Sequence, residues 1–196
     1  MIGETKMKKG KIIILNGTSS AGKSTLARVL QDRVSEAFFV ISGDDYMQML
    51  GRSKYVDISN ESYIQYNLVE AYTAKALSDR GMNLIMDTVH FTDTEEEVGL
   101  KEWVELLRDN PVLFVMVTCP LEELRRREKE RSDRDMRYDW DGKAESQIAT
   151  LYPQDIYDIT IDNHKNTNEE CADKIIELLN CPEKFSAFKT LWLQRA

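Results

Sequence analysis

The chain has 196 residues, of which 42% are hydrophobic and 31% charged, as in folded globular proteins and unlike disordered, collagen-like or coiled-coil ones. Its formal net charge of -8 argues against a dedicated nucleic-acid-binding protein, because such proteins neutralise phosphates with many cationic side chains. The three cysteines show no C-x-x-C spacing, and we find no signal-like or membrane-length apolar run. We therefore expect reduced thiols and a cytoplasmic protein that does not associate with a membrane.

Short apolar segments alternate with amphipathic ones along the chain. The apolar segments predict strands over Lys11–Asn16, Phe38–Ile41, Met82–Met86 and Val112–Thr118, with a weaker one over Asp158–Ile161. Helices are predicted over Ser24–Glu36, Glu61–Arg80, Thr92 to about Arg108, a charged segment after Pro120, and Thr167–Leu179, and capping boxes are predicted at Thr92-x-x-Glu95 and Thr167-x-x-Glu170. This alternation predicts an α/β fold with a mainly parallel sheet, in which ligands bind at the carboxyl ends of the strands.

A phosphate-binding motif follows the first strand. It matches G-x-x-x-x-G-K-[ST] at every fixed position and consists of Gly17, Thr18, Ser19, Ser20, Ala21, Gly22, Lys23, Ser24 and Thr25. Such a loop wraps closely around a polyphosphate, with its N–H groups pointing at the anion. We expect Lys23 to reach the β- and γ-phosphates of ATP and Ser24 to ligate Mg²⁺. The alternative is a glycine-rich turn with a surface lysine, but the order strand, motif, helix favours the nucleotide site.

Two adjacent acids, Asp44 and Asp45, follow the second predicted strand. A kinase needs a carboxylate there to orient the acceptor hydroxyl and take its proton, whereas a protein that only hydrolyses a nucleotide does not. We expect Asp44 to be this base, with Asp45 as the second candidate. Either acid could instead cap the next helix, and two acids allow both roles.

Asp87 stands at the end of the third predicted strand. An acid in this position beside a P-loop commonly holds Mg²⁺, directly or through water, and we expect Asp87 to do so. Contact with the acceptor, or a simple turn or capping role, is the alternative. We assign no role to His90 nearby, because a lone histidine close to a site is more often structural.

A basic patch lies in the charged helix. Arg127, Arg131 and Arg134 have i, i+4, i+7 spacing, at which like charges repel unless an anion lies between them. A transferring phosphoryl group is such an anion, so we expect Arg131 and Arg134 to be catalytic and Arg127 to bind the nucleotide. A solvated helix, in which Glu123 pairs with Arg127 and Glu130 with Arg134, is the alternative. We expect residues of about 127–142 to form a mobile lid.

These motifs together resemble the chloramphenicol phosphotransferase family. Ile13–Thr25, which reads IILNGTSSAGKST, is similar to the family's opening, and Asp44 falls at its proposed catalytic aspartate. Ile85–Val89 resembles its acid-bearing third strand, with Thr88 where a second aspartate is usual, and Arg127–Arg134 resembles its lid motif. The similarity spans roughly residues 11–179.

The resemblance implies a three-layer, nucleoside-kinase-like P-loop fold with a five-stranded parallel sheet and an arginine-bearing lid. It also implies ATP and Mg²⁺ as cosubstrates and phosphoryl transfer to a hydroxyl. Residues 46–66, where the family builds its antibiotic pocket, do not match position by position, so another small hydroxyl compound is favoured over chloramphenicol. We expect residues 1–196 to form a single domain that ends in a helical tail over about 182–196; the oligomeric state stays open.

Two other functions remain alternatives to a small-molecule kinase. A polynucleotide 5′-hydroxyl kinase would share the motif of Asp44, Asp45 and Tyr46, but the acidic net charge argues against nucleic acid as a partner. A nucleotide-dependent switch without transfer activity would keep Lys23 and Ser24 and would need no base at Asp44.

Overall fold

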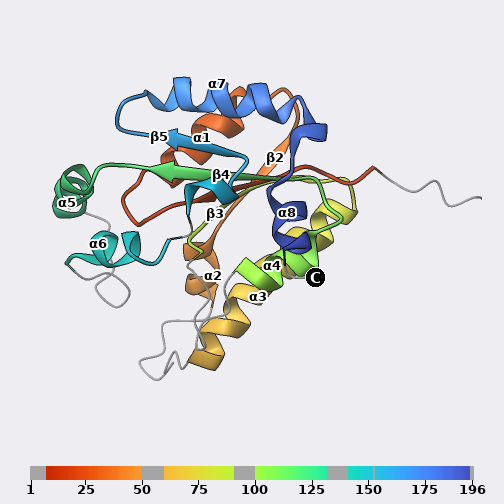
Figure 1. The fold of residues 1–196 in the computed structure, drawn as a ribbon, viewed down its shortest axis with the longest axis horizontal. Helices are drawn as coiled ribbons and strands as arrows, with labels where there is room; N and C mark the ends of the chain where they lie inside the picture. The colour runs from red at the N-terminus through yellow and green to blue at the C-terminus, as the bar shows by residue number, and fades with distance from the viewer. Residues whose placement is uncertain (1–7, 50–59, 91–99, 132–140, 152, 195–196) are drawn as a thin grey trace, which may run out of the picture.

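The computed structural model describes residues 8–49, 60–90, 100–131, 141–151 and 153–194 (Figure 1). Within these ranges, five strands form one parallel sheet in the order β2-β3-β1-β4-β5. The strands are β1 (Ile12–Asn16), β2 (Phe38–Ser42), β3 (Asn83–Thr88), β4 (Val112–Thr118) and β5 (Ile159–Asp162). The predicted α/β class and parallel sheet are confirmed.

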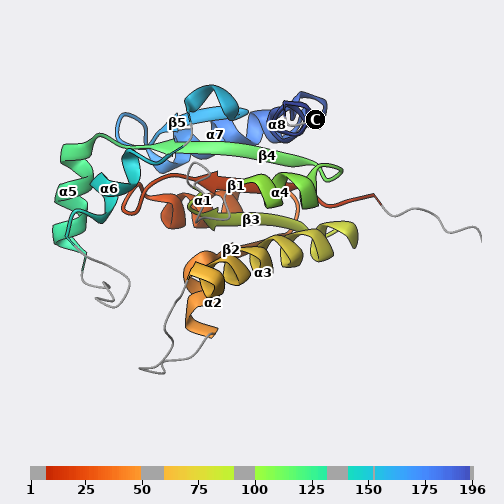
Figure 2. The ribbon, with the colours of Figure 1, turned by 60° about the horizontal axis from the view of Figure 1, so that its bottom comes forward.

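Helices cover both faces of the sheet. They are α1 (Lys23–Arg33), α2 (Gly43–Met49), α3 (Asn60–Asp79), α4 (Leu100–Leu107), α5 (Leu121–Glu130), α6 (Lys143–Ile148), α7 (Asn168–Leu179) and α8 (Ala187–Leu193), with 3₁₀ turns η1 (Gln154–Ile156) and η2 (Pro182–Lys184). Helices α1 and α7 lie on one face, while α3, α4 and α8 lie on the other (Figures 1 and 2). Helix, sheet and helix therefore form three layers. None of the described helices is both long and apolar enough to span a membrane.

The side chains of the central strand, β1, pack into a hydrophobic core on each face of the sheet. All five residues of β1 are buried, as a run of apolar and mostly β-branched side chains predicts. Ile13 and Leu15 point to the core under α1 and α7, whereas Ile12 and Ile14 point to the core under α3, α4 and α8. Because Leu15 pairs with Asp87 in the register of β1 and β3, Asp87 faces the α1 side. This alternation directs the acid towards the P-loop.

Several element boundaries differ from the sequence prediction. Helix α1 ends at Arg33, three residues early, because Val34 has extended backbone angles. Strand β3 starts one residue later than predicted and runs to Thr88, so Asp87 lies within the strand and not after it. The capping box predicted for α7 is confirmed, since Thr167 and Glu170 exchange hydrogen bonds. The capping box predicted at Thr92 lies outside the described residues.

Candidate active site

The P-loop joins β1 to α1. Its two motif glycines cannot be replaced by larger residues without a clash, because neighbouring atoms occupy the space that a Cβ would take. A Cβ at Gly17 would lie 2.3 Å from the carbonyl oxygen of Val117 on β4. Gly22 has a φ of 92°, in the left-handed region, and a Cβ there would lie 2.2 Å from Asn163 Nδ2. The loop is thus packed closely against the ends of β4 and β5. Such packing leaves a fixed backbone that could receive an anion.

Lys23, Ser24 and Asp87 converge beside the loop. The Ser24 hydroxyl donates a hydrogen bond to Asp87 Oδ2 at 2.5 Å, and Lys23 Nζ lies 3.7 Å from Asp87 Oδ1. Lys23 Nζ also donates to the Thr18 carbonyl oxygen at 3.0 Å. The side chains of Lys23 and Asp87 are each only 8% exposed. Three predicted site residues from two different elements therefore lie in direct contact.

Asp44 and Asp45 lie in the first turn of α2, which begins directly after β2. The Ser42 hydroxyl accepts a hydrogen bond from the Asp44 N–H at 3.2 Å, and Asp45 Oδ2 accepts one from the Ser42 N–H at 3.3 Å. These bonds have the pattern of a helix cap in which Asp45 is the returning acid. The Asp44 side chain is exposed. Because Ser42 pairs with Asp87 across the sheet, this turn begins at the same edge as Asp87.

A hollow of about 590 Å³ lies against β2 and α2. Its described lining consists of Val40, Ile41, Asp45, Tyr46 and Met49. This volume is in the range that small-molecule sites occupy.

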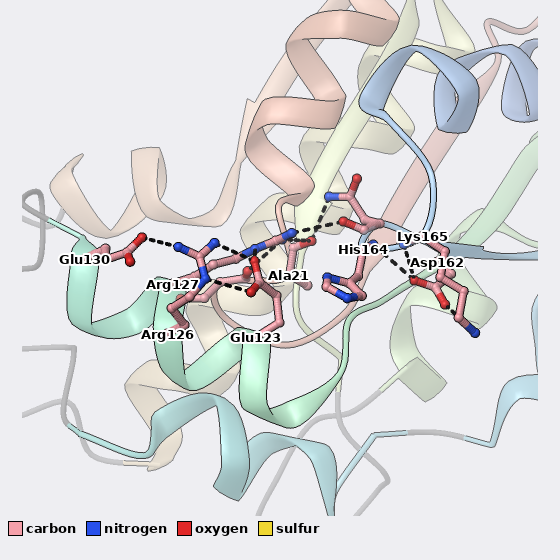
Figure 3. Close-up of polar contacts among 10 residues, drawn as sticks. Ala21, Glu123, Arg126, Arg127, Glu130, Asp162, His164 and Lys165 are labelled. Atoms are coloured by element: carbon pink, nitrogen blue, oxygen red, sulfur yellow. Dashed lines mark hydrogen bonds and ion pairs between the residues drawn. The ribbon is translucent and has the colours of Figure 1, made fainter.

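The arginine helix α5 separates into a solvent-facing side and a side that faces the P-loop (Figure 3). Arg126 pairs with Glu123 and Glu130, the arrangement expected of a solvated charged helix. Arg127 pairs with Glu123 at 2.8 Å, and its guanidinium also donates to the carbonyl oxygens of Ser20 and Ala21, both at 3.4 Å. Hydrogen bonds from Arg126 and Arg127 lower the pKa of Glu123 to about 2.

The expectation that Arg131 shares a helix face with Arg127 is wrong. Helix α5 ends at Glu130 because Arg131 has extended backbone angles, with ψ at 122°. From this position Arg131 Nη1 reaches the Ser19 hydroxyl oxygen at 3.4 Å. Arg134, and most of the expected lid, lie outside the described residues.

The loop after β5 lies against the P-loop and α5. Asn163 is buried, and its Nδ2 donates to the Ala21 carbonyl oxygen at 2.9 Å. Arg127 Nη2 donates to the Asn163 carbonyl oxygen at 3.0 Å. Burial raises the pKa of Asp162, but the N–H groups of Lys165 and His164 outweigh it and hold this pKa below its usual range. Figure 3 shows the Asp162 carboxylate with its contacts to His164 and Lys165.

A buried polar cluster supports the start of the P-loop from the opposite face. Asn16 donates to the Tyr157 hydroxyl at 2.7 Å and to the His90 carbonyl oxygen at 3.2 Å, and its Oδ1 accepts the His90 N–H at 2.7 Å. Burial lowers the pKa of His90 to about 3 and raises that of Tyr157 to about 12, so both side chains are neutral near pH 7.

The sequence analysis missed Asn16, Asn163 and Gln147. Asn16 could have been singled out, because it is a polar residue inside an otherwise apolar strand. The chain offers no local signal for Asn163 or for Gln147, whose Oε1 accepts the Ser19 N–H.

Comparison with known proteins identifies the family. The family model described as chloramphenicol phosphotransferase-like protein matches residues 10–180. The chain belongs to this family. A curated relative from Mycobacterium tuberculosis (strain CDC 1551 / Oshkosh), named "Putative O-phosphotransferase", is 34% identical over 157 residues. That match covers 65% of this chain and 66% of the relative, so the chain spans slightly less than two thirds of the relative's length.

Solved structures of P-loop kinases share the fold of this family member. An unliganded sugar kinase from Janibacter sp. HTCC2649 has a TM-score of 0.64 at 18% identity, and the match covers 90% of this chain and 98% of the kinase. The APS kinase of Mycobacterium tuberculosis, solved with AMPPNP and APS, has a TM-score of 0.62 at 19% identity, with 89% and 99% of the two chains covered. These similarities establish the P-loop kinase fold.

Proposed function

We propose that this chain is an ATP- and Mg²⁺-dependent kinase that transfers the γ-phosphoryl group of ATP to a hydroxyl of a small molecule. The observation that carries the proposal is the contact of Ser24 and Lys23 with Asp87 beside the P-loop. A buried lysine, a hydroxyl and a carboxylate at one point are the groups that phosphoryl transfer needs. Membership of the chloramphenicol phosphotransferase-like family supports the same reaction class.

The donor set around Asp87 suits magnesium. Mg²⁺ prefers hard oxygen ligands and is usually held by one or two carboxylates together with substrate phosphates. The Ser24 hydroxyl and the Asp87 carboxylate supply such oxygens, 2.5 Å apart. When bound, the metal ion would neutralise charge on the phosphates. Lys23 would exchange the Thr18 carbonyl oxygen for phosphate oxygens, and the loop N–H groups would bind the remaining ones.

Asp44 is the proposed base. Both side chains are exposed, but Asp45 already accepts the Ser42 N–H and so caps α2, whereas Asp44 takes part in this cap through its backbone N–H. In the proposed step, Asp44 takes the proton of the acceptor hydroxyl while the oxygen of that hydroxyl forms a bond to the γ-phosphorus of ATP. The bond from the γ-phosphorus to the bridging oxygen breaks, and ADP leaves.

Arg131 and Arg134 are proposed to neutralise charge on the transferred group. Arg131 supports this role because it reaches Ser19 in the first half of the P-loop. For Arg134 the support is its place in the sequence segment that resembles the family's lid motif. We propose Arg127 as a residue of the nucleotide site, since it contacts the loop carbonyls of Ser20 and Ala21.

The acceptor is proposed to be a small hydroxyl compound. The hollow beside β2 and α2 offers about 590 Å³, and its described lining mixes apolar side chains with Asp45 and Tyr46. The name of the Mycobacterium relative points to transfer onto oxygen as well.

The test is an ADP-release assay against a panel of hydroxyl compounds. The panel should include chloramphenicol, nucleosides, sugars and a 5′-hydroxyl oligonucleotide, with Asp44→Asn and Asp45→Asn as matched variants. With the best acceptor, Asp44→Asn should lower turnover by about 10²–10⁴-fold and leave ATP binding intact, since it removes only the base. Asp45→Asn should cost at most about 1 kcal/mol of stability, as loss of a helix cap does.

Two outcomes would count against this assignment. If Asp45→Asn abolishes transfer while Asp44→Asn does not, the base is Asp45. If the wild-type protein binds ATP but phosphorylates no member of a broad panel, the nucleotide-dependent switch becomes the better account.

A further inference from the structure

The side chain of Gln147 contacts the P-loop backbone. Gln147 lies in α6, 128 residues along the chain from Ser19, yet its Oε1 accepts the Ser19 N–H at 2.6 Å. The Gln147 side chain is buried, with 8% exposed. In a P-loop the backbone N–H groups are the anion ligands, but here a protein oxygen already holds one of them.

Helix α6 is firmly attached to α5, so Gln147 is presented from a fixed support. Ala144 is fully buried in the core, and its N–H donates to the buried Glu128 carboxylate of α5 at 2.8 Å. Arg125 of α5 donates two hydrogen bonds to Glu145 Oε2, at 2.6 and 3.1 Å. Gln147 follows Ala144 by three residues and therefore lies on the same helix face. While Ala144 enters the core, Gln147 reaches the loop.

Arg127 contacts both halves of the P-loop, at Ser20 and at Ala21, and each half also has contacts of its own. The second half is held by Asn163, which contacts Ala21, and by Asp87, which contacts Lys23 and Ser24. The first half includes Ser20, a non-glycine residue with a left-handed φ of 61°. A residue in this conformation persists only when its surroundings hold it. Gln147 and Arg131 contact Ser19 directly before it, at the N–H and at the side-chain hydroxyl respectively.

We propose that Gln147 is a positioning residue that holds Ser19 and Ser20 in place for the γ-phosphoryl group. The inference rests on the proposed function, in which Arg131 neutralises the transferred group and Ser19, its contact, therefore lies beside that group. Gln147 acts through the backbone of Ser19, which lies four residues before Lys23 at the N-terminus of α1, where the helix N–H groups also bind phosphates. Its effect should therefore depend on whether the nucleotide carries a γ-phosphate.

The experiment compares binding of ADP and of the non-hydrolysable ATP analogue AMPPNP, each with Mg²⁺, by titration calorimetry. Gln147→Ala should weaken AMPPNP binding by about three- to tenfold, the range for one lost hydrogen bond, and change ADP binding by less than about twofold. Gln147→Glu keeps the accepting oxygen but puts a negative charge beside the terminal phosphate. It should weaken AMPPNP binding at least as much, again with little effect on ADP.

Ser146→Ala is the control, because Ser146 is an exposed residue of the same helix whose hydroxyl donates to the Lys143 carbonyl oxygen of α6. It should bind both nucleotides as the wild type does. Equal losses for ADP and AMPPNP in Gln147→Ala, no loss in either, or tighter AMPPNP binding would each overturn the proposal. If Gln147→Ala does not fold, Gln147→Asn decides in its place, since it keeps the polar amide but is one methylene too short for the contact with Ser19, and the same three outcomes would overturn the proposal. A wild-type protein that binds neither nucleotide would refute the proposed function itself, which is a different result.

Discussion

Replacing Asp87 by asparagine should affect both the stability of the fold and its response to magnesium. Asparagine has nearly the same volume and can still accept the Ser24 hydrogen bond, so the change removes mainly the charge. Lys23 Nζ lies 3.7 Å from Asp87 Oδ1, which corresponds to a Coulomb attraction of about 4.5 kcal/mol at an effective dielectric constant of about 20. Loss of one partner from a buried ion pair typically costs about 3–5 kcal/mol.

We take about 3 kcal/mol as the expected loss, because the Lys23 ammonium keeps its bond to the Thr18 carbonyl oxygen. Unfolding entropy of about 2.1 cal/mol/K per residue gives about 0.4 kcal/mol/K for 196 residues. The melting temperature of the ligand-free variant should therefore fall by about 7 °C. Differential scanning calorimetry measures this shift, and Asp155→Asn, a change of an exposed residue in η1, is the control.

The same variant should lose the dependence of ATP binding on magnesium. Without the carboxylate, Mg²⁺ is bound more weakly, so the affinity for MgATP falls. Metal-free ATP is also repelled less by the site, so its affinity rises. The ratio of ATP affinities with and without Mg²⁺ should therefore approach one. If Asp87→Asn melts within about 1 °C of the wild type and keeps its magnesium dependence, the reasoning from the Lys23–Asp87 contact is refuted.

Two further predictions follow from buried groups. Lys23→Met keeps the buried aliphatic stem but removes the ammonium; it should abolish ATP turnover while circular dichroism still shows a folded protein, and native turnover would contradict the phosphate-binding role. His90 is neutral when folded because burial lowers its pKa to about 3, whereas the unfolded chain takes up the proton near a pKa of about 6.5. The contribution of the neutral His90 side chain to the free energy of unfolding is therefore fully present above pH 6.5 and is lost as the pH falls towards 3. Between pH 6.5 and 5, this free energy should fall by about 2 kcal/mol. His90→Phe retains an aromatic ring against Trp103, 4.5 Å away, and should remove this loss in urea unfolding at the two pH values; an unchanged loss would show that other groups cause it.

The chain by itself determined the parts of this protein that depend on short-range patterns. The apolar runs of β1 and β4 and the capping box of α7 specify those elements locally, so their positions could be predicted. The spacing of Gly17, Gly22, Lys23 and Ser24 likewise specifies the P-loop, because a loop, a lysine and a helix N-terminus must follow one another to bind phosphates.

Only the tertiary structure decided which distant groups meet at that loop. The sequence already predicted Asp87 beside the P-loop, but its direct contact with Ser24 depends on the register between β1 and β3, which directs Asp87 to the α1 face. Arg131 reaches Ser19 because α5 ends at Glu130 instead of continuing, which the run of charged residues did not indicate. Gln147 meets the P-loop because Ala144 anchors α6 in the core, a contact set by packing between elements. Hydrogen-bond partners that lie more than a hundred residues apart depend on how the layers pack, and packing follows from the whole chain and not from any one segment.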